Sequence, residues 1–174
     1  EFNIENFLSI FILLKLVNID NDIIRNNLIN LKSLPHRMEQ IMSRDNLIVI
    51  NDSKSTGFSS LKEGIKYCVS NYSLYNLIII MGGKLDLEEI RKYVSFIKSL
   101  KKYKVYCYGE NKKILKKLIN CESYETLEEV INNMVVMQFQ LILFSPASQS
   151  LDQFKSFEER GNKFKNLIFK KLNL

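Results

Sequence analysis

After Arg37 the sequence alternates short apolar runs with amphipathic stretches, and this alternation constrains the fold more than any other feature. The apolar runs predict strands over 47–50, 77–81, 105–108 and 141–144. The stretches between them predict helices over 59–69, 87–100, 112–119, 127–136 and from about 150 to 172. Apolar runs of four to five residues separated by helices are typical of a mainly parallel sheet covered on both faces. We therefore expect an α/β domain over residues 37–174.

The first 36 residues follow a different pattern. Apolar residues recur at helical spacing from Ile4 to Lys32, with a turn around 18–21, and Leu34-Pro35-His36 ends the pattern. This predicts a helical hairpin and a domain boundary after His36. The apolar stretch 7–17 is too short to cross a bilayer and lacks a basic leader, so we expect a buried helix and no membrane partner. Because the chain starts at Glu1 and not at Met, we expect the natural N-terminus to be missing.

Charge and cysteine content narrow the function classes. The formal net charge is +6, but the lysines lie around predicted helix ends without an aromatic ladder or a nucleic-acid motif, so we expect no nucleic-acid partner. Cys68, Cys107 and Cys121 are widely spaced and form no C-x-x-C pair. That pattern indicates neither a disulfide framework nor a zinc site, and it favours a reducing cytoplasm.

Three predicted strands end in loops with binding chemistry. NDSKSTG follows Ile50, GGK follows Met81 and SPASQS follows Phe144. Ligands gather at the carboxyl ends of the strands in such sheets, so we expect these loops to form one binding site. Within SPASQSLDQ, Ser150 and Gln153 fit a capping box, which predicts a helix start at Ser150 whose free N–H groups would favour a carboxylate or phosphate.

The residues of these loops leave alternatives open. Asp52 and Lys54 would face the same side of an extended segment, where they could form an ion pair or hold a ribose hydroxyl and a phosphate. Lys84 follows two glycines, which suits either close approach of a ligand or a tight turn. Arg37 could bind phosphate or form a packing salt bridge at the domain junction. For His36, the chain's one histidine, we favour a structural role.

One apolar stripe of the last predicted helix should face the sheet. It contains Phe154, Phe157, Gly161, Phe164 and Ile168, with Gly161 allowing close approach of helix and sheet. The sequence has no G-x-x-x-x-G-K-[ST] phosphate loop and no metal-ligand cluster. A nucleotide-dependent reaction could therefore not be completed by this chain alone.

Taken together, these segments resemble the Mur ligase family along nearly the whole chain. Phe2-Asn3-Ile4-Glu5-Asn6 is similar to the start of a helix in the family's central ATPase domain, and LPHRME to its interdomain motif. INDSKSTG is similar to the family's DSKATN loop, GGK to its glycine-lysine loop, and SPASQSLDQFKSFEERGNKF to its C-terminal signature. The Asp-Asn-Pro-Arg motif of the diaminopimelate-adding members is absent, which favours the D-glutamate-adding member.

The resemblance implies a Rossmann-like C-terminal domain over 37–174, preceded over 1–36 by a helical remnant of the central ATP-binding domain. It implies ATP and Mg²⁺ as cofactors, with the Mg²⁺ ligands outside this chain, and D-glutamate and UDP-N-acetylmuramoyl-L-alanine as substrates joined through an acyl phosphate. Asn6, Arg37 and Asp52 would hold the nucleotide, and Lys54 would lie close to the reacting groups. The residues that would position D-glutamate are Thr56, Lys84, Ser150, Leu151 and Phe157.

Two other interpretations stay open at the level of sequence. The chain could be a non-catalytic remnant or split-gene module that binds a partner or ligand without turnover. It could also belong to a sister ligase that adds another amino acid, or to a relative of folylpolyglutamate synthase.

Overall fold

The computed structural model describes residues 4–29, 34–44 and 46–173, and the chain divides into two units, Glu1–Ser33 and Leu34–Leu174. The first unit holds α1 (Ile4–Leu16) and α2 (Asn21–Ile29), which confirms the helical hairpin. The expectation that the stretch 7–17 is buried is wrong, since most of its apolar side chains are exposed, including Leu13 at 62% and Leu16 at 73%. Two short helices offer each other too little surface to bury both apolar faces.

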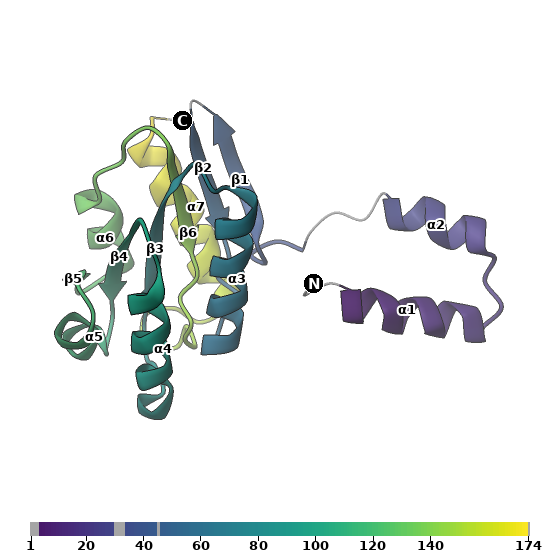
Figure 1. The fold of residues 1–174 in the computed structure, drawn as a ribbon, viewed down its shortest axis with the longest axis horizontal. Helices are drawn as coiled ribbons and strands as arrows, with labels where there is room; N and C mark the ends of the chain where they lie inside the picture. The colour runs from purple at the N-terminus through teal and green to yellow at the C-terminus, as the bar shows by residue number, and fades with distance from the viewer. Residues whose placement is uncertain (1–3, 30–33, 45, 174) are drawn as a thin grey trace. The chain divides into compact units, whose positions relative to one another are not determined.

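A six-stranded sheet forms the centre of the second unit, in the order β1-β2-β6-β3-β4-β5 (Figure 1). The strands are β1 (Glu39–Arg44), β2 (Leu47–Asn51), β3 (Asn76–Gly82), β4 (Tyr103–Tyr108), β5 (Cys121–Tyr124) and β6 (Gln140–Phe144). β1 pairs with β2 antiparallel, and all other pairs are parallel. The mainly parallel α/β fold is therefore confirmed.

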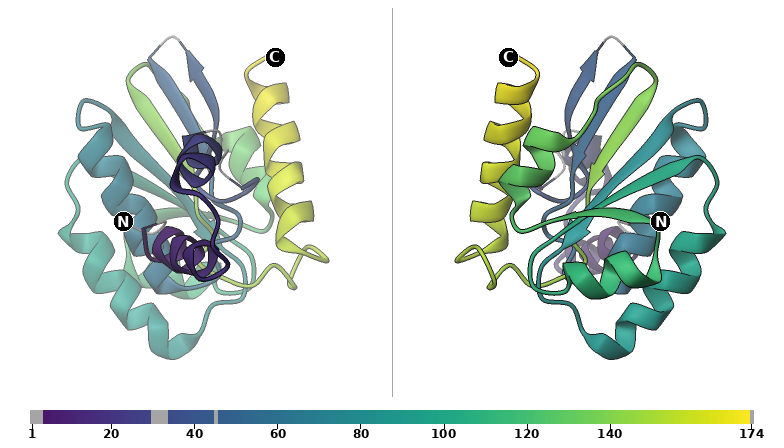
Figure 2. Two further views of the ribbon diagram at one scale, coloured as in Figure 1. Left: turned by 90° about the vertical axis from the view of Figure 1, so that its right-hand side faces the viewer. Right: turned by 90° about the vertical axis from the view of Figure 1, so that its left-hand side faces the viewer.

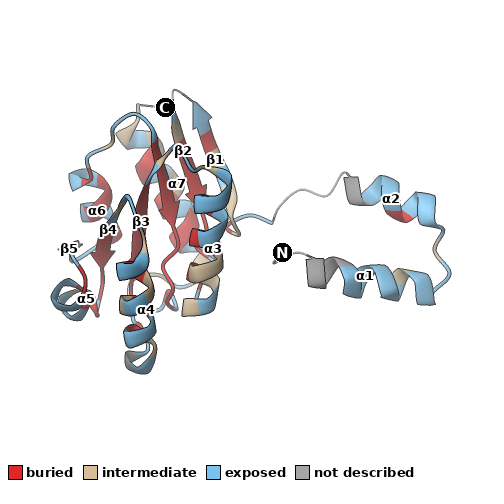
Figure 3. Cartoon of the chain, in the orientation of Figure 1, coloured by how far each residue is buried: buried red, intermediate tan, exposed pale blue. Residues whose placement is uncertain are grey.

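Helices cover both faces of this sheet (Figure 2). One face packs against α3 (Phe58–Asn71), α4 (Leu87–Ser99) and α5 (Lys112–Leu118), and the other against α6 (Leu127–Asn133) and α7 (Phe157–Lys171). The four central strands are buried almost throughout because side chains of both faces enter a core (Figure 3). Within the described part of the chain, none of the helices is long and apolar enough to cross a membrane.

The start of α7 differs from the sequence-based expectation. The helix begins at Phe157 and not near Ser150, with Ser156 as its N-cap. The Ser156 hydroxyl accepts a hydrogen bond from Glu159 N (3.2 Å), and the Glu159 carboxylate accepts one from Lys155 N (2.7 Å). Gln153, the expected capping partner of Ser150, instead donates to the Glu125 carbonyl (2.7 Å). A carboxylate suits the positive end of a helix better than an amide does. The pair Ser156 and Glu159, and not Ser150 and Gln153, therefore marks the start of α7.

Candidate functional site

The three loops expected to form a site meet at the carboxyl edge of the sheet. Asp52 N donates to the Phe144 carbonyl (2.8 Å), and Gly82 N donates to the Pro146 carbonyl (3.1 Å). The loop after β6 therefore contacts both other loops, because β6 lies between β2 and β3. Gly82 and Gly83 have φ of 142° and 109°, and a Cβ at Gly83 would overlap the Ser148 hydroxyl, so this turn requires glycine.

Lys54 and Asp52 lie in a turn, closed by the hydrogen bond from Ser55 N to the Asp52 carbonyl (2.9 Å). The extended segment assumed for this pair is therefore wrong. Lys54 is exposed, and its ammonium lies 5.3 Å from the centroid of the half-buried Phe157 ring. Asp52 is only 5% exposed. The two side chains thus do not form a side-by-side pair, and Lys54 instead approaches a residue from α7.

Asp52 faces inward, toward the loop before β1 and the loop after β6. Its carboxylate accepts hydrogen bonds from Met38 N (3.1 Å) and from the Ser145 hydroxyl (2.9 Å). Burial raises the pKa of Asp52 to about 6, against the opposing effects of these two donors and of the Arg37 charge. Strongly shifted carboxyl groups gather at functional sites, which supports a role for this edge of the sheet.

The raised pKa of Asp52 predicts a stability that falls as pH rises. The folded state holds the proton up to about pH 6 and the unfolded chain only up to about pH 4, so folding loses up to about 3 kcal/mol across that interval from this group. Asp52→Asn should remove this part of the pH dependence, which denaturant unfolding at pH 4 to 7 would measure. The matched control is Glu110→Gln at an exposed position. An unchanged slope in Asp52→Asn would contradict the assignment.

The residues assigned to D-glutamate lie around the same edge. Lys84 forms an isolated antiparallel bridge with Gln149, which places it beside the turn that contains Ser150 and Leu151. Lys84 and Thr56 are exposed, and Leu151 is 71% exposed, whereas Ser150 is 6% exposed. Because α7 starts at Phe157, the expected cradle of helix N–H groups at Ser150 is wrong, and Ser150 would act through its hydroxyl or its turn.

The residues assigned to the nucleotide are less closely grouped. Arg37 is half-buried between His36 and Met38, whose φ values of 62° and 45° fold the linker residues 36–38 sharply. Asn6 lies in α1, and its side chain falls outside the described residues. A phosphate would fit the cations Arg37 and Lys54, whereas direct contact of a ribose with Asp52 would require that carboxylate to exchange its internal partners.

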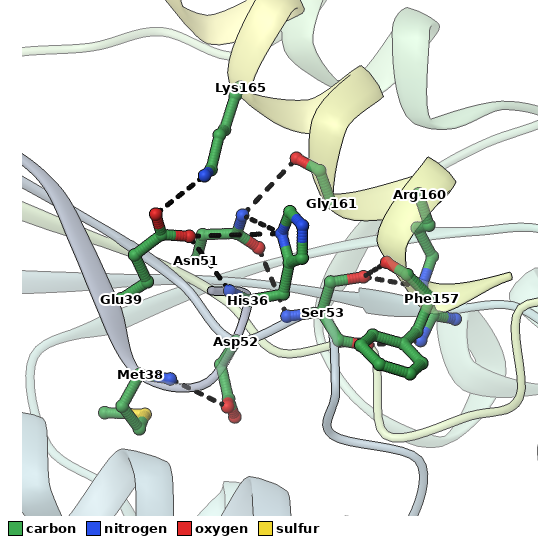
Figure 4. Close-up of polar contacts among 10 residues, drawn as sticks. All are labelled: His36, Met38, Glu39, Asn51, Asp52, Ser53, Phe157, Arg160, Gly161 and Lys165. Atoms are coloured by element: carbon green, nitrogen blue, oxygen red, sulfur yellow. Dashed lines mark hydrogen bonds and ion pairs between the residues drawn. The ribbon is translucent and has the colours of Figure 1, made fainter. Parts of the chain in front are cut away.

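Sequence analysis missed Arg160, which is fully buried directly behind the loops (Figure 4). Its guanidinium donates to the Ser53 carbonyl (2.7 Å), the Ser53 hydroxyl (3.1 Å) and the Ser148 hydroxyl (3.4 Å). The Ser53 hydroxyl in turn donates to the Phe157 carbonyl (2.8 Å), and the Ser148 hydroxyl donates to the Gly82 carbonyl. One arginine thus links all three loops to α7. Arg160 stands four residues before Phe164, on the buried stripe of α7, and this spacing could have indicated from the sequence that Arg160 is buried.

A second missed residue is Asn51, which joins the linker, β2 and α7 (Figure 4). The structural role expected for His36 is confirmed, since its ring is 5% exposed and its Nδ1 lies 3.0 Å from Asn51 Nδ2. A Cβ at Gly161 would overlap the His36 ring. Glycine is therefore needed at position 161 to leave room for the His36 ring. The reason expected from the sequence, close approach of α7 to the sheet, is wrong.

The arrangement suits an anionic ligand with several charges. Lys54, Lys84 and Arg37, together with the hydroxyls of Thr56 and Ser150, border one edge of the sheet. Fixed cations and hydroxyls at such an edge can orient carboxylates and phosphates. In the described residues no group of three His, Cys, Asp or Glu side chains is placed to hold a metal ion.

The chain aligns over almost its whole length with curated proteins named as ligases. A UDP-N-acetylmuramoylalanine–D-glutamate ligase of Prochlorococcus marinus (strain MIT 9515) is 37% identical over 99% of this chain and 37% of its own length. Proteins of the same name from Buchnera aphidicola subsp. Baizongia pistaciae and Rickettsia felis are 39% and 34% identical over 80% and 95% of this chain, and 31% and 37% of their own lengths. The chain belongs to the Mur ligase family. No family model matches the sequence.

Solved structures agree with this Mur ligase assignment at the level of the fold. A UDP-N-acetylmuramate-alanine ligase from Thermotoga maritima superposes with a TM-score of 0.71 at 15% identity, over 94% of this chain and 37% of that chain. A folylpolyglutamate synthase from the same organism gives a TM-score of 0.54 at 13% identity, over 90% and 36%. This chain therefore spans about a third of the length of the Mur ligase relatives that it matches.

Proposed function

We propose that this chain is the C-terminal, D-glutamate-binding part of a longer ATP-dependent ligase. That enzyme joins D-glutamate to UDP-N-acetylmuramoyl-L-alanine through an acyl phosphate, in the synthesis of peptidoglycan precursors. The observation that carries the proposal is the alignment of 99% of this chain with ligases of that name at 35–37% identity. Residues 1–36 would be the end of the central ATP-binding domain, and 37–174 the C-terminal domain. Three buried free cysteines support action in the reducing cytoplasm.

The geometry of the carboxyl edge supports distinct roles for its residues. Lys54 would neutralise charge on the acyl phosphate, since its ammonium is exposed beside Phe157. Lys84, next to Gln149, would bind a D-glutamate carboxylate together with Ser150 and Thr56. Arg37 would contact nucleotide phosphate, and Asp52 would fix the linker through Met38 N. Phosphoryl transfer and ligation depend mainly on such positioning and charge neutralisation. The Mg²⁺ ligands would lie outside this chain.

A ligation assay on the protein encoded by the complete gene tests the proposal. ATP and UDP-N-acetylmuramoyl-L-alanine are supplied with D-glutamate, L-glutamate or diaminopimelate, a parallel reaction contains ATP, a folate and L-glutamate, and product and ADP are measured. We expect product with D-glutamate. Product with another amino acid would identify a sister ligase, and product from a folate substrate would place the chain with the folylpolyglutamate synthases. The absence of turnover, with D-glutamate still bound by the chain, would identify a non-catalytic module.

Ser150→Ala should mainly weaken the use of D-glutamate. Loss of one hydrogen bond to a charged carboxylate costs about 1.5–3 kcal/mol, so KM for D-glutamate should rise about tenfold or more while KM for ATP stays unchanged. Steady-state kinetics on the complete ligase would measure both. Ser156→Ala is the matched control, because that serine caps α7 and its loss should reduce stability and leave KM for D-glutamate unchanged. A change confined to ATP affinity in Ser150→Ala would contradict the role.

A further inference from the structure

The Asn51 carboxamide contacts three separate parts of the second unit. Nδ2 lies 3.0 Å from His36 Nδ1 on the linker and 3.3 Å from the Gly161 carbonyl oxygen in α7. Oδ1 accepts a hydrogen bond from Ser53 N (3.2 Å) in the loop after β2. Asn51 is fully buried, so each of these contacts lies away from water (Figure 4). We call these residues the Asn51 network: His36, Asn51, Ser53 and Gly161.

Two backbone groups determine the orientation of the carboxamide. The Gly161 carbonyl can only accept, so the NH₂ group must face it, and Ser53 N can only donate, so the oxygen must face it. The NH₂ group therefore also faces His36 Nδ1, which must act as an acceptor. The network thus requires the neutral His36 tautomer with its proton on Nε2.

The same linker is hydrogen-bonded to the proposed reaction site. The backbone N–H of Lys54 donates to the His36 carbonyl (2.9 Å), and Met38 N donates to Asp52 (3.1 Å). Glu39 accepts from His36 N (2.9 Å) and forms an ion pair with Lys165 of α7 (2.6 Å). A displacement of His36 would therefore shift the backbone of Lys54, and it would also shift Arg37, which lies between His36 and Met38.

We propose that Asn51 is a positioning residue that acts through neutral, Nε2-protonated His36 to hold Lys54 and Arg37 in place. This role rests on the proposed ligase function. Asn51 itself contacts backbone and His36, and it orients the residues that would meet the substrates. Gly161 completes the arrangement, because any side chain there would occupy the space of the His36 ring.

Nuclear magnetic resonance on the 174-residue chain tests the network without any assay of activity. His36 is the one histidine in the sequence, so its two ring nitrogens are assigned without ambiguity. We expect Nε2 to carry the proton and Nδ1 to remain unprotonated near neutral pH. Burial and the Lys165 charge lower the pKa of His36, opposed by Glu39 and Glu158. A proton on Nδ1 would overturn the proposal.

Two variants test whether Asn51 positions Lys54. Asn51→Asp replaces the NH₂ group with an acceptor, so the pKa of His36 should rise, and hydrogen-exchange protection of the Lys54 amide should fall about tenfold while Ile79 in β3 stays protected. Asn51→Ser should lower the Lys54 protection without adding charge. Asn162→Asp, the same change at an exposed position of α7, should alter neither readout. Unchanged Lys54 protection in the Asn51 variants would overturn the positioning role. The His36 tautomer is read on the unaltered chain, so a variant that fails to fold leaves that test intact.

Kinetics on the complete ligase then separate this inference from the proposed function. Asn51→Ser should lower kcat by about tenfold and leave KM for UDP-N-acetylmuramoyl-L-alanine unchanged, since a misplaced Lys54 affects the reacting groups. An unchanged kcat would overturn the role of Asn51 in the reaction. If the unaltered ligase forms no product with D-glutamate, the proposed function fails, and the resonance experiments still decide whether the Asn51 network exists.

Discussion

Lys54→Ala should lower turnover of the proposed full-length ligase by about 100- to 1,000-fold. Charge that develops on the acyl phosphate and on the attacked carboxyl group needs a fixed cation, and Lys54 is the exposed lysine of the loop after β2, held over the Phe157 ring. Because the ammonium is exposed, folding should depend little on it. The change is therefore expected in kcat, measured by product formation at saturating substrates, with the melting temperature nearly unchanged.

Two further variants isolate the role of the Lys54 charge. Lys62→Ala removes a lysine that lies in the same way over an aromatic ring, with Nζ 5.9 Å from the Phe58 centroid, but on the surface of α3. It should leave kcat unchanged. Lys54→Arg keeps the charge and should retain more activity than Lys54→Ala. Full turnover in Lys54→Ala would remove this residue from the reaction.

Arg160→Met should destabilise the second unit by about 3 kcal/mol or more. The substitution keeps much of the apolar volume but removes the donors to the carbonyl and hydroxyl of Ser53 and to the Ser148 hydroxyl, all of them buried. It also removes a positive charge that lowers the pKa of Asp152 against the raising effect of burial. Denaturant unfolding of the 174-residue chain would measure the loss.

The control for Arg160 is Arg91→Met on the exposed surface of α4, where we expect a change within about 0.5 kcal/mol. Arg160→Lys tests geometry, because one ammonium cannot reproduce the planar set of donors, and it should recover only part of the stability. An Arg160→Met variant as stable as the unaltered chain would show that the serines find other partners.

The interior of the sheet could be predicted from the sequence because its strands are buried on both faces. β2, β3, β4 and β6 each contain an uninterrupted apolar run, because side chains on both faces of these strands are buried. The two edge strands were missed because they lack such a run. β1 (EQIMSR) and β5 (CESY) have neighbours on one side only, and their partly exposed polar residues give no continuous run.

The candidate site was predicted in its loops but not in its internal supports. The topology alone brings the segments after Ile50, Met81 and Phe144 to one edge, so their convergence followed from the strand pattern. The positions of Asn51 and Arg160 depend on contacts across 110 and 107 residues of sequence, with Gly161 and Ser53. Local patterns do not contain that information. The predicted start of α7 was wrong because two capping patterns stand six residues apart, and the helix uses the second, in which the Glu159 carboxylate accepts from Lys155 N.

The hydrogen bonds of residues 36–38 fix this linker within the second unit. His36 and Met38 form hydrogen bonds with Asn51, Lys54 and Asp52, so residues 36–38 are anchored inside the unit Leu34–Leu174. The backbone on both sides of Arg37 is therefore held by hydrogen bonds to the loop that carries Lys54, so these two cations keep a fixed spacing within the second unit.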